Sequence, residues 1–128
     1  MYSHVFRSGQ DPTRHPTVIL IHGLGGTLNI WDPGASVLEH RFSVLRYDLR
    51  GHGKSDVPAG DWSLEDFVGD LDAIFINTSL RHAHLVGFSL GGLIVQQFAL
   101  SYPKYVGQLA ILSAVAGRTG DELSLIHI

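Results

Sequence analysis

Four short apolar segments of the chain alternate with longer segments in which hydrophobic residues recur at helical spacing. The segment at residues 17–21, "TVILI", is β-branched and has no polar residue at alternate positions. That pattern is typical of a strand buried on both faces. Similar segments cover 42–47 and begin at His84 ("HLVG") and at Val106 ("VGQLAILSA"). We expect each of the four to form a strand.

Three helices are predicted between these strands. Residues 29–40 can form a short helix if Pro33 lies near its first turn, where a missing N–H is tolerated. A second helix begins after Ser63, an N-cap candidate with Asp66 three residues later in a variant of the capping box. A third covers 90–102 and ends before a proline. The apolar residues that share one face of the second helix are Leu64, Phe67, Val68, Leu71 and Phe75.

The resulting order, β-α-β-α-β-α-β, predicts an α/β fold with a mostly parallel sheet and helices on both faces. In such sheets, ligands bind beyond the carboxyl ends of the strands. Stretches rich in glycine or charge follow Ile21, Tyr47 and Gly87, each at the end of a predicted strand. Their convergence at one edge predicts a functional site there.

Composition narrows the class of protein further. The chain has 128 residues, of which 45% are hydrophobic, so it suits one globular domain or part of a larger one. A net charge of −3 without a basic cluster argues against nucleic acid or an anionic membrane as partner. No cysteine and no H-E-x-x-H motif accompany the eight histidines, so we expect no metal site. No segment resembles a signal peptide or a spanning helix, and we expect a cytoplasmic protein.

Residues 85–95, "LVGFSLGGLIV", place Ser89 between a predicted strand and a predicted helix. Gly87 and Gly91 remove the Cβ atoms that would clash in a turn this tight, and such a turn lifts the hydroxyl above the sheet. The new helix directs its amides and the positive end of its dipole at the same point. We therefore predict that Ser89 is a nucleophile. The alternative is a glycine-rich turn with an N-capping serine.

The segment "HGLGG", residues 22–26, supplies a second half of the site. Acyl transfer creates an oxyanion, which two preorganised N–H groups can stabilise. We predict that the amides of Leu24 and Leu90 are these donors. The alternative is a dinucleotide-binding G-x-G-x-x-G loop with Asp48 as the ribose-binding acid, but Leu28 occupies the position of the third glycine. That alternative also leaves Ser89 unexplained.

Taken together, "LIHGLGGT", "RYDLRGHGKSD" and "GFSLGG" resemble the α/β-hydrolase fold family, and in particular its small esterases and lactonases. The segments "RYDLRGHGKSDVPAGDWSLEDFVGDL" and "SAVAGRTGDE" are most similar to 3-oxoadipate enol-lactonases. The resemblance begins near Thr17. It implies that Ser89 is the nucleophile and that the Leu24 and Leu90 amides form the oxyanion hole. A serine at this turn is unlike haloalkane dehalogenases and epoxide hydrolases, which have aspartate there.

The same resemblance assigns roles to the polar residues nearby. Asp48, Arg50 and His52 look catalytic, but in the family their segment is mostly a hydrogen-bonded loop that braces the site. His22 orients the oxyanion loop rather than carrying protons. Trp31 and Phe88 are the candidates for substrate contacts, although both are also suited to packing.

The partners of the serine are not evident in this sequence. In this fold the order along the chain is Ser, then Asp or Glu, then His. The one histidine after Ser89 is His127, and Asp121 and Glu122 come too early to be the acid. The ending "LSLIHI" matches a translation of CTG TCT CTT ATA CAC ATC, which resembles a transposon end used in sequencing adapters. We therefore expect a partial hydrolase domain at 1–122 and an adapter-derived tail at 123–128, with a genuine apolar tail as the alternative.

These observations predict the N-terminal half of a serine hydrolase. The full protein would cleave a small-molecule carboxylic ester or lactone, including a 3-oxoadipate enol-lactone, through an acyl-enzyme without metal or organic cofactor. The segment alone should be nearly inert, and it should fold poorly because its last strand is an unpaired apolar edge. Other chemistry of the same fold stays open, such as cofactor-free haloperoxidase or carbon–carbon hydrolase activity. So does a non-catalytic binding protein of this fold.

Overall fold

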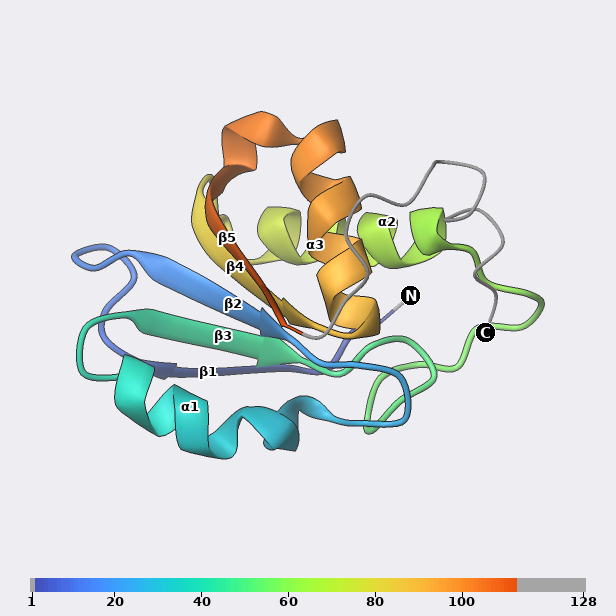
Figure 1. Cartoon of the computed structure of the whole chain (residues 1–128), viewed down its shortest axis with the longest axis horizontal. Coiled ribbons are helices and arrows are strands. Elements are labelled where there is room, and N and C mark those ends of the chain that lie inside the picture. The colour runs from blue at the N-terminus through green and yellow to red at the C-terminus, as the bar shows by residue number, and fades with distance from the viewer. Residues whose placement is uncertain (1, 113–128) are drawn as a thin grey trace.

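In the part of the chain that the structure describes, a five-stranded sheet with the strand order β1-β3-β2-β4-β5 forms the centre. The computed structural model describes residues 2–112. Figure 1 shows the sheet with helices on both of its faces. The α/β fold class with a mostly parallel sheet is confirmed. The predicted strands correspond to β2 (Thr17–Ile21), β3 (Ser43–Tyr47), β4 (Ala83–Phe88) and β5 (Val106–Leu112).

The strand β1 (Val5–Gly9) was not predicted, so the expected element order was wrong at its start. It pairs antiparallel with β3 and forms one edge of the sheet. Its sequence, "VFRSG", lacks a continuous apolar pattern because only part of an edge strand is buried. Val5 packs against the core, whereas Phe6 is exposed and lies under the guanidinium of Arg46.

The helices occupy the predicted positions, with one difference. Residues 29–40 do not form one helix, because a 3-10 turn that Thr27 caps precedes α1 and Pro33 lies in the first turn of α1. Ser63 donates its amide N–H to the Asp66 carboxylate at 2.8 Å, which confirms the capping box. Across residues 2–112, no helix is long and apolar enough to cross a membrane. The helical elements are η1 (Leu28–Trp31), α1 (Asp32–Leu38), α2 (Leu64–Asn77), α3 (Leu90–Ser101) and η2 (Pro103–Tyr105).

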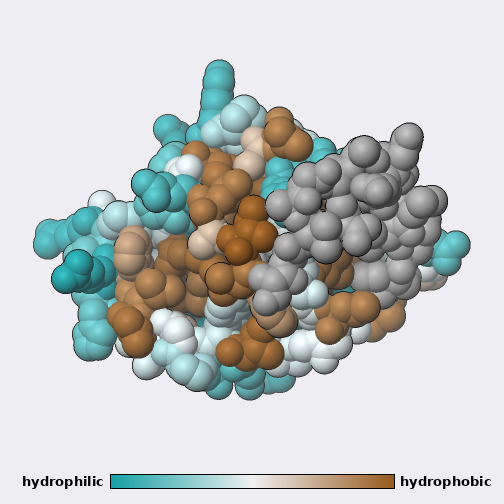
Figure 2. Space-filling model, viewed as in Figure 1, coloured by the Kyte–Doolittle hydropathy of each residue, from teal (hydrophilic) through white to brown (hydrophobic). Residues whose placement is uncertain are grey.

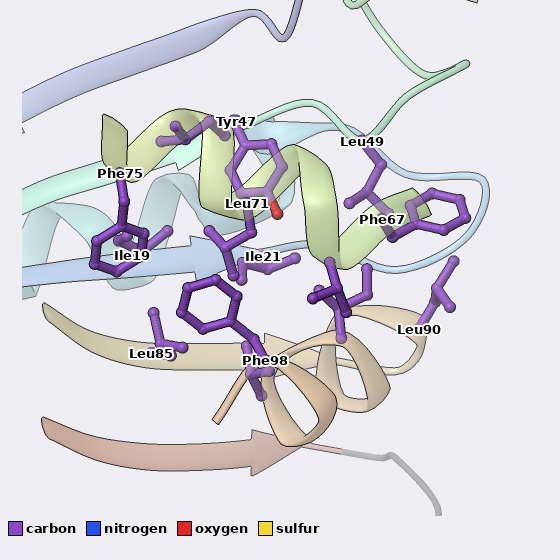
Figure 3. Close-up of a cluster of buried hydrophobic side chains, with 14 of the residues drawn as sticks. Ile19, Ile21, Tyr47, Leu49, Phe67, Leu71, Phe75, Leu85, Leu90 and Phe98 are labelled. Carbon is purple, nitrogen blue, oxygen red and sulfur yellow. The ribbon is translucent and has the colours of Figure 1, made fainter. Parts of the chain in front are cut away.

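Two apolar clusters hold the layers together. On one face, Ile19 and Ile21 of β2 pack with residues of α2 and α3, as Figure 3 shows. On the other face, Val18 and Leu20 pack with Ala35 of α1. Because both faces of β2 are covered, every residue of the strand is buried and Thr17 is its one polar residue. The predicted apolar face of α2 is fully buried in the larger cluster.

The strand β5 forms the other edge of the sheet within the part of the chain that the structure describes. Leu109, Ile111 and Leu112 are exposed, and Figure 2 shows apolar side chains gathered over this strand. A groove of about 420 Å³ runs beside it and is lined by Phe42 and His84, among others. Within residues 2–112, β5 is therefore an apolar edge strand, as predicted. Poor folding of the chain stays a prediction.

Candidate active site

Ser89 lies at the turn that joins β4 to α3, with φ of 56° and ψ of −117°. A positive φ is uncommon for a residue with a side chain and stores strain that the surroundings must hold. The Ser89 amide donates to the carbonyl of Leu112 at 2.9 Å, and its own carbonyl accepts from the Gly92 amide at 2.9 Å. The turn is thus fixed on both sides, and the Ser89 side chain is partly exposed.

Close backbone approaches explain the glycines around this turn. A Cβ on Gly87 would overlap the carbonyl oxygen of Gly91, and a Cβ on Gly91 would overlap that of Ile21. A Cβ on Gly23 would come within 2.9 Å of the Cβ of Ser89. The strand-to-helix turn and the loop after β2 are therefore in direct contact, which brings the two predicted halves of the site together.

The substitution Gly91→Ala is expected to lower the free energy of unfolding by about 1–3 kcal/mol, because the new methyl group meets backbone that cannot rotate away. The matched control is Gly69→Ala in α2, where a Cβ has open space. That variant should be neutral or more stable by up to about 1 kcal/mol, since alanine favours a helix interior. Urea unfolding measures both variants, and equal effects would contradict the close approach at Gly91.

The amides of Leu24 and Leu90 have no acceptor among residues 2–112. Leu90 is the first residue of α3, so its N–H has no partner within the helix. The next amides of the loop are already engaged: Gly25 donates to Nε2 of His52 at 2.9 Å, and Gly26 donates to the carbonyl of Gly23 at 3.1 Å. Two such donors, one in the loop that contacts the Ser89 turn and one at the start of α3, are what an oxyanion hole needs.

His22 is fully buried behind the same loop. The Leu49 amide donates to Nε2 of His22 at 3.0 Å, so Nδ1 carries the proton and donates to the carbonyl of Gly23 at 2.7 Å. Burial lowers the pKa of His22, which keeps the ring neutral. This geometry supports the expectation that His22 orients the loop and does not transfer protons.

A pH dependence follows from His22. Because the pKa of His22 is lowered in the folded protein, the unfolded chain binds the proton at higher pH. Its contribution to stability is therefore complete above the pKa of a free histidine, about 6.5, and is lost as the pH falls, by at most ~1.4 kcal/mol per pH unit. Urea unfolding as a function of pH measures the loss. Ring-nitrogen NMR should show the Nδ1–H form below pH 6.5, and a ring that titrates like free histidine would contradict this account.

Asp48 is buried and both of its carboxylate oxygens accept hydrogen bonds from the backbone. Oδ1 accepts from the Leu28 amide at 2.8 Å, and Oδ2 accepts from the Lys54 amide at 3.0 Å. The hydroxyl of Ser55 donates to the Asp48 carbonyl at 2.6 Å. Asp48 therefore ties neighbouring loops together, which favours the bracing role over a ribose-binding one.

Arg50 anchors the segment after β3 to α2. Its Nε and Nη2 donate to the two carboxylate oxygens of Asp70, each at 2.8 Å. The guanidinium lies 5.8 Å from the ring of Trp62 and 5.9 Å from that of Phe67. Hydrogen bonding to Asp70 raises the pKa of Arg50. Asp70 was missed by the sequence analysis, although a carboxylate beside an apolar helical face was a usable signal.

The two candidates for substrate contacts lie in different surroundings. Phe88 is partly exposed beside the nucleophile turn, and its ring would come within 3.2 Å of a Cβ on Gly23. Trp31 packs against the apolar cluster under α1, and its buried indole N–H has no partner within residues 2–112. Phe88 thus lies next to the predicted nucleophile, while the contacts of Trp31 favour packing. A substrate role for either residue stays a prediction.

Several sequence-based expectations concern residues that the structure does not describe. His127, Asp121, Glu122 and the suspected tail at 123–128 all lie outside residues 2–112. Their assignments therefore stay predictions.

The family of the chain follows from comparison with known proteins. Residues 16–126 match the family model described as the alpha/beta hydrolase fold. The chain belongs to this family, in agreement with the sheet order and with the Ser89 turn described above.

Three relatives show how much of the family fold the chain covers. It is 36% identical over 106 residues to an uncharacterized protein of Mycobacterium tuberculosis, covering 83% of this chain and 31% of the relative. It is 39% identical over 92 residues to the putative carbamate hydrolase RutD of Escherichia coli, covering 71% of this chain and 35% of the relative. The enol-lactonase of Burkholderia xenovorans LB400 superposes with a TM-score of 0.86 at 31% identity, covering 89% and 44% of the two chains. The chain thus spans less than half the length of each.

Proposed function

We propose that this chain is the N-terminal part of a serine hydrolase that cleaves a small carboxylic ester or lactone through an acyl-enzyme, with no metal or organic cofactor. The observation that carries the proposal is Ser89, held at positive φ on a turn that contacts the loop after β2, together with the amides of Leu24 and Leu90, which have no acceptor within residues 2–112. We further propose that the protein acts in the cytoplasm. The longer protein that this proposal implies is called the full-length protein below.

The chemistry would begin with attack of Ser89 Oγ on the carbonyl carbon of the substrate. A general base takes the hydroxyl proton, and the carbonyl oxygen becomes negative and accepts hydrogen bonds from the Leu24 and Leu90 amides. Collapse of this intermediate breaks the carbon–oxygen bond, and the leaving alkoxide takes the proton. Water then attacks the acyl-enzyme by the same route and releases the acid. We expect the base and its carboxylate partner in the part of the full-length protein beyond the matched segment.

The substrate class is the finer part of the proposal. Likeness to an enol-lactonase supports a lactone, in agreement with the resemblance to 3-oxoadipate enol-lactonases. A carbamate is the second candidate, because the relative at 39% identity is a putative carbamate hydrolase. Both substrates present a carbonyl that would form the same type of oxyanion. The two candidates therefore share one site and differ in the group that leaves.

A substrate panel on the full-length protein tests the proposal. It contains an enol-lactone, an aryl ester and a carbamate of similar size, each assayed with and without added metal chelator. We expect hydrolysis of the lactone and the ester that the chelator leaves unchanged. Preferred cleavage of the carbamate would replace the lactone assignment. Tight binding of all three without turnover would favour a non-catalytic binding protein.

The origin of residues 123–128 is tested separately. We propose that these six residues are translated from adapter DNA rather than from the gene. Sequencing independent clones through this region should show a different continuation after Glu122. An uninterrupted gene that encodes "LSLIHI" in every clone would contradict the proposal.

A further inference from the structure

We propose that His52 is a positioning residue that holds the oxyanion loop, residues 22–26, in its working shape. The inference rests on the proposed function of Ser89 and adds a residue outside the nucleophile, the oxyanion donors and the expected catalytic partners. It comes from a hydrogen bond that joins the loop after β2 to the loop after β3, two segments separated in sequence by α1 and β3.

The hydrogen bonds of His52 define its tautomer. The Gly25 amide donates to Nε2 at 2.9 Å, so this nitrogen has no proton. Nδ1 lies 2.9 Å from the carbonyl of Arg50 and donates to it. Both ring nitrogens are therefore used by the neutral imidazole. Arg50 is itself bound to Asp70 of α2, so the ring connects the oxyanion loop to a fixed helix.

Apart from the bond from the Gly26 amide to the Gly23 carbonyl at 3.1 Å, the tip of the loop has few contacts. Leu24 is 62% exposed, and Gly25 has φ of 82° with open space around its Cβ position. Packing therefore does not set the orientation of these peptides, and hydrogen bonds must do so. His22 binds the Gly23 carbonyl from the buried side, and His52 binds the Gly25 amide from the other side. The Leu24 amide, which the proposal assigns to the oxyanion hole, lies between these two attachments.

The bond depends on the neutral tautomer of His52, because Nε2 can accept from the Gly25 N–H only while it carries no proton. The rings of His22 and His52 lie 5.3 Å apart between centroids, and both nitrogens of His22 are already engaged. Both carboxylate oxygens of Asp48 accept amide bonds elsewhere, so His52 is the group that accepts from the Gly25 amide.

Two substitutions in the full-length protein separate positioning from general stability. His52→Leu removes the acceptor, and we expect kcat to fall about 10- to 100-fold with KM within about 2-fold, since misplaced groups cost up to about that much. His52→Gln keeps an oxygen acceptor that cannot be protonated. It should restore most of kcat. The matched control is His40→Leu, at an exposed position after α1, with unchanged kinetics.

An NMR measurement tests the contact without relying on activity. The ¹⁵N and ¹H shifts of the Gly25 amide should move in His52→Leu, which lacks the acceptor, and should stay near those of the unsubstituted protein in His52→Gln. That pattern of shifts in a protein without hydrolase activity would overturn the proposed function but support the contact. Full kcat in His52→Leu would overturn the positioning role while leaving the hydrolase assignment intact.

Discussion

Replacing Ser89 by alanine in the full-length protein is expected to lower kcat by about 10⁶, the scale of loss when a serine hydrolase loses its nucleophile. The reason is chemical, because without Oγ no acyl-enzyme forms and water must attack the bound substrate directly. The oxyanion donors remain and leave a small residual rate above the uncatalysed reaction. Steady-state assays on the preferred substrate of the panel measure the loss.

The chain supplies a matched control for that substitution. Ser79 is the other non-glycine residue with positive φ within the described residues, at 58°, and it lies just after α2 rather than at the strand-to-helix turn. Ser79→Ala changes the same atoms at the same kind of backbone position and should leave turnover within a factor of 2. A Ser89→Ala protein that keeps more than a few per cent of its activity would contradict nucleophilic catalysis by Ser89.

Replacing Asp70 by asparagine is expected to lower the free energy of unfolding by about 3 kcal/mol or more, since it leaves a poorly exposed guanidinium without its counter-charge. The side chains of Arg50 and Asp70 are only 12% and 7% exposed. The substitution should also lower kcat, because the backbone carbonyl of Arg50 accepts the hydrogen bond that orients the His52 ring. Urea unfolding measures the stability, and kcat measured under folding conditions reports the effect on the site.

A surface pair provides the comparison. Arg46 binds Asp32, whose side chain is 62% exposed, and it also donates to the carbonyl of Leu28 at 3.1 Å. Asp32→Asn should therefore cost less than about 1 kcal/mol, as is usual for exposed pairs. If Asp32→Asn and Asp70→Asn destabilise equally, the Arg50 pair is not the anchor that the structure indicates.

The elements that the sequence predicted are those whose burial is complete. The strand β2 is covered on both faces, so its continuous apolar pattern predicted a buried strand. The glycine spacing around Ser89 reflects two close backbone approaches. The strand β1 was missed because an edge strand that is only partly buried needs few apolar residues. β1 is held by its hydrogen bonds to β3, and the apolar pattern of its own sequence does not specify that pairing.

The features of the candidate site also differ in whether a local sequence pattern predicts them. The assignment of Ser89, Leu24 and Leu90 to the candidate site rests on motifs, because each motif encodes a local turn. The bonds from His52 to Gly25 and from Arg50 to Asp70 join segments 27 and 20 residues apart, and no local pattern specifies them. The bracing role of the segment after β3 was expected from the family resemblance, but its hydrogen-bond partners required coordinates.

Reaction of the full-length protein with a fluorophosphonate tests the central claim most directly. Such a probe phosphonylates a serine only where a base activates the hydroxyl and an oxyanion hole accepts the P–O oxygen. We predict a single covalent adduct, which tandem mass spectrometry locates at Ser89 and which is absent in Ser89→Ala. An unlabelled protein, or an adduct on another residue, would contradict the assignment of Ser89 as the nucleophile.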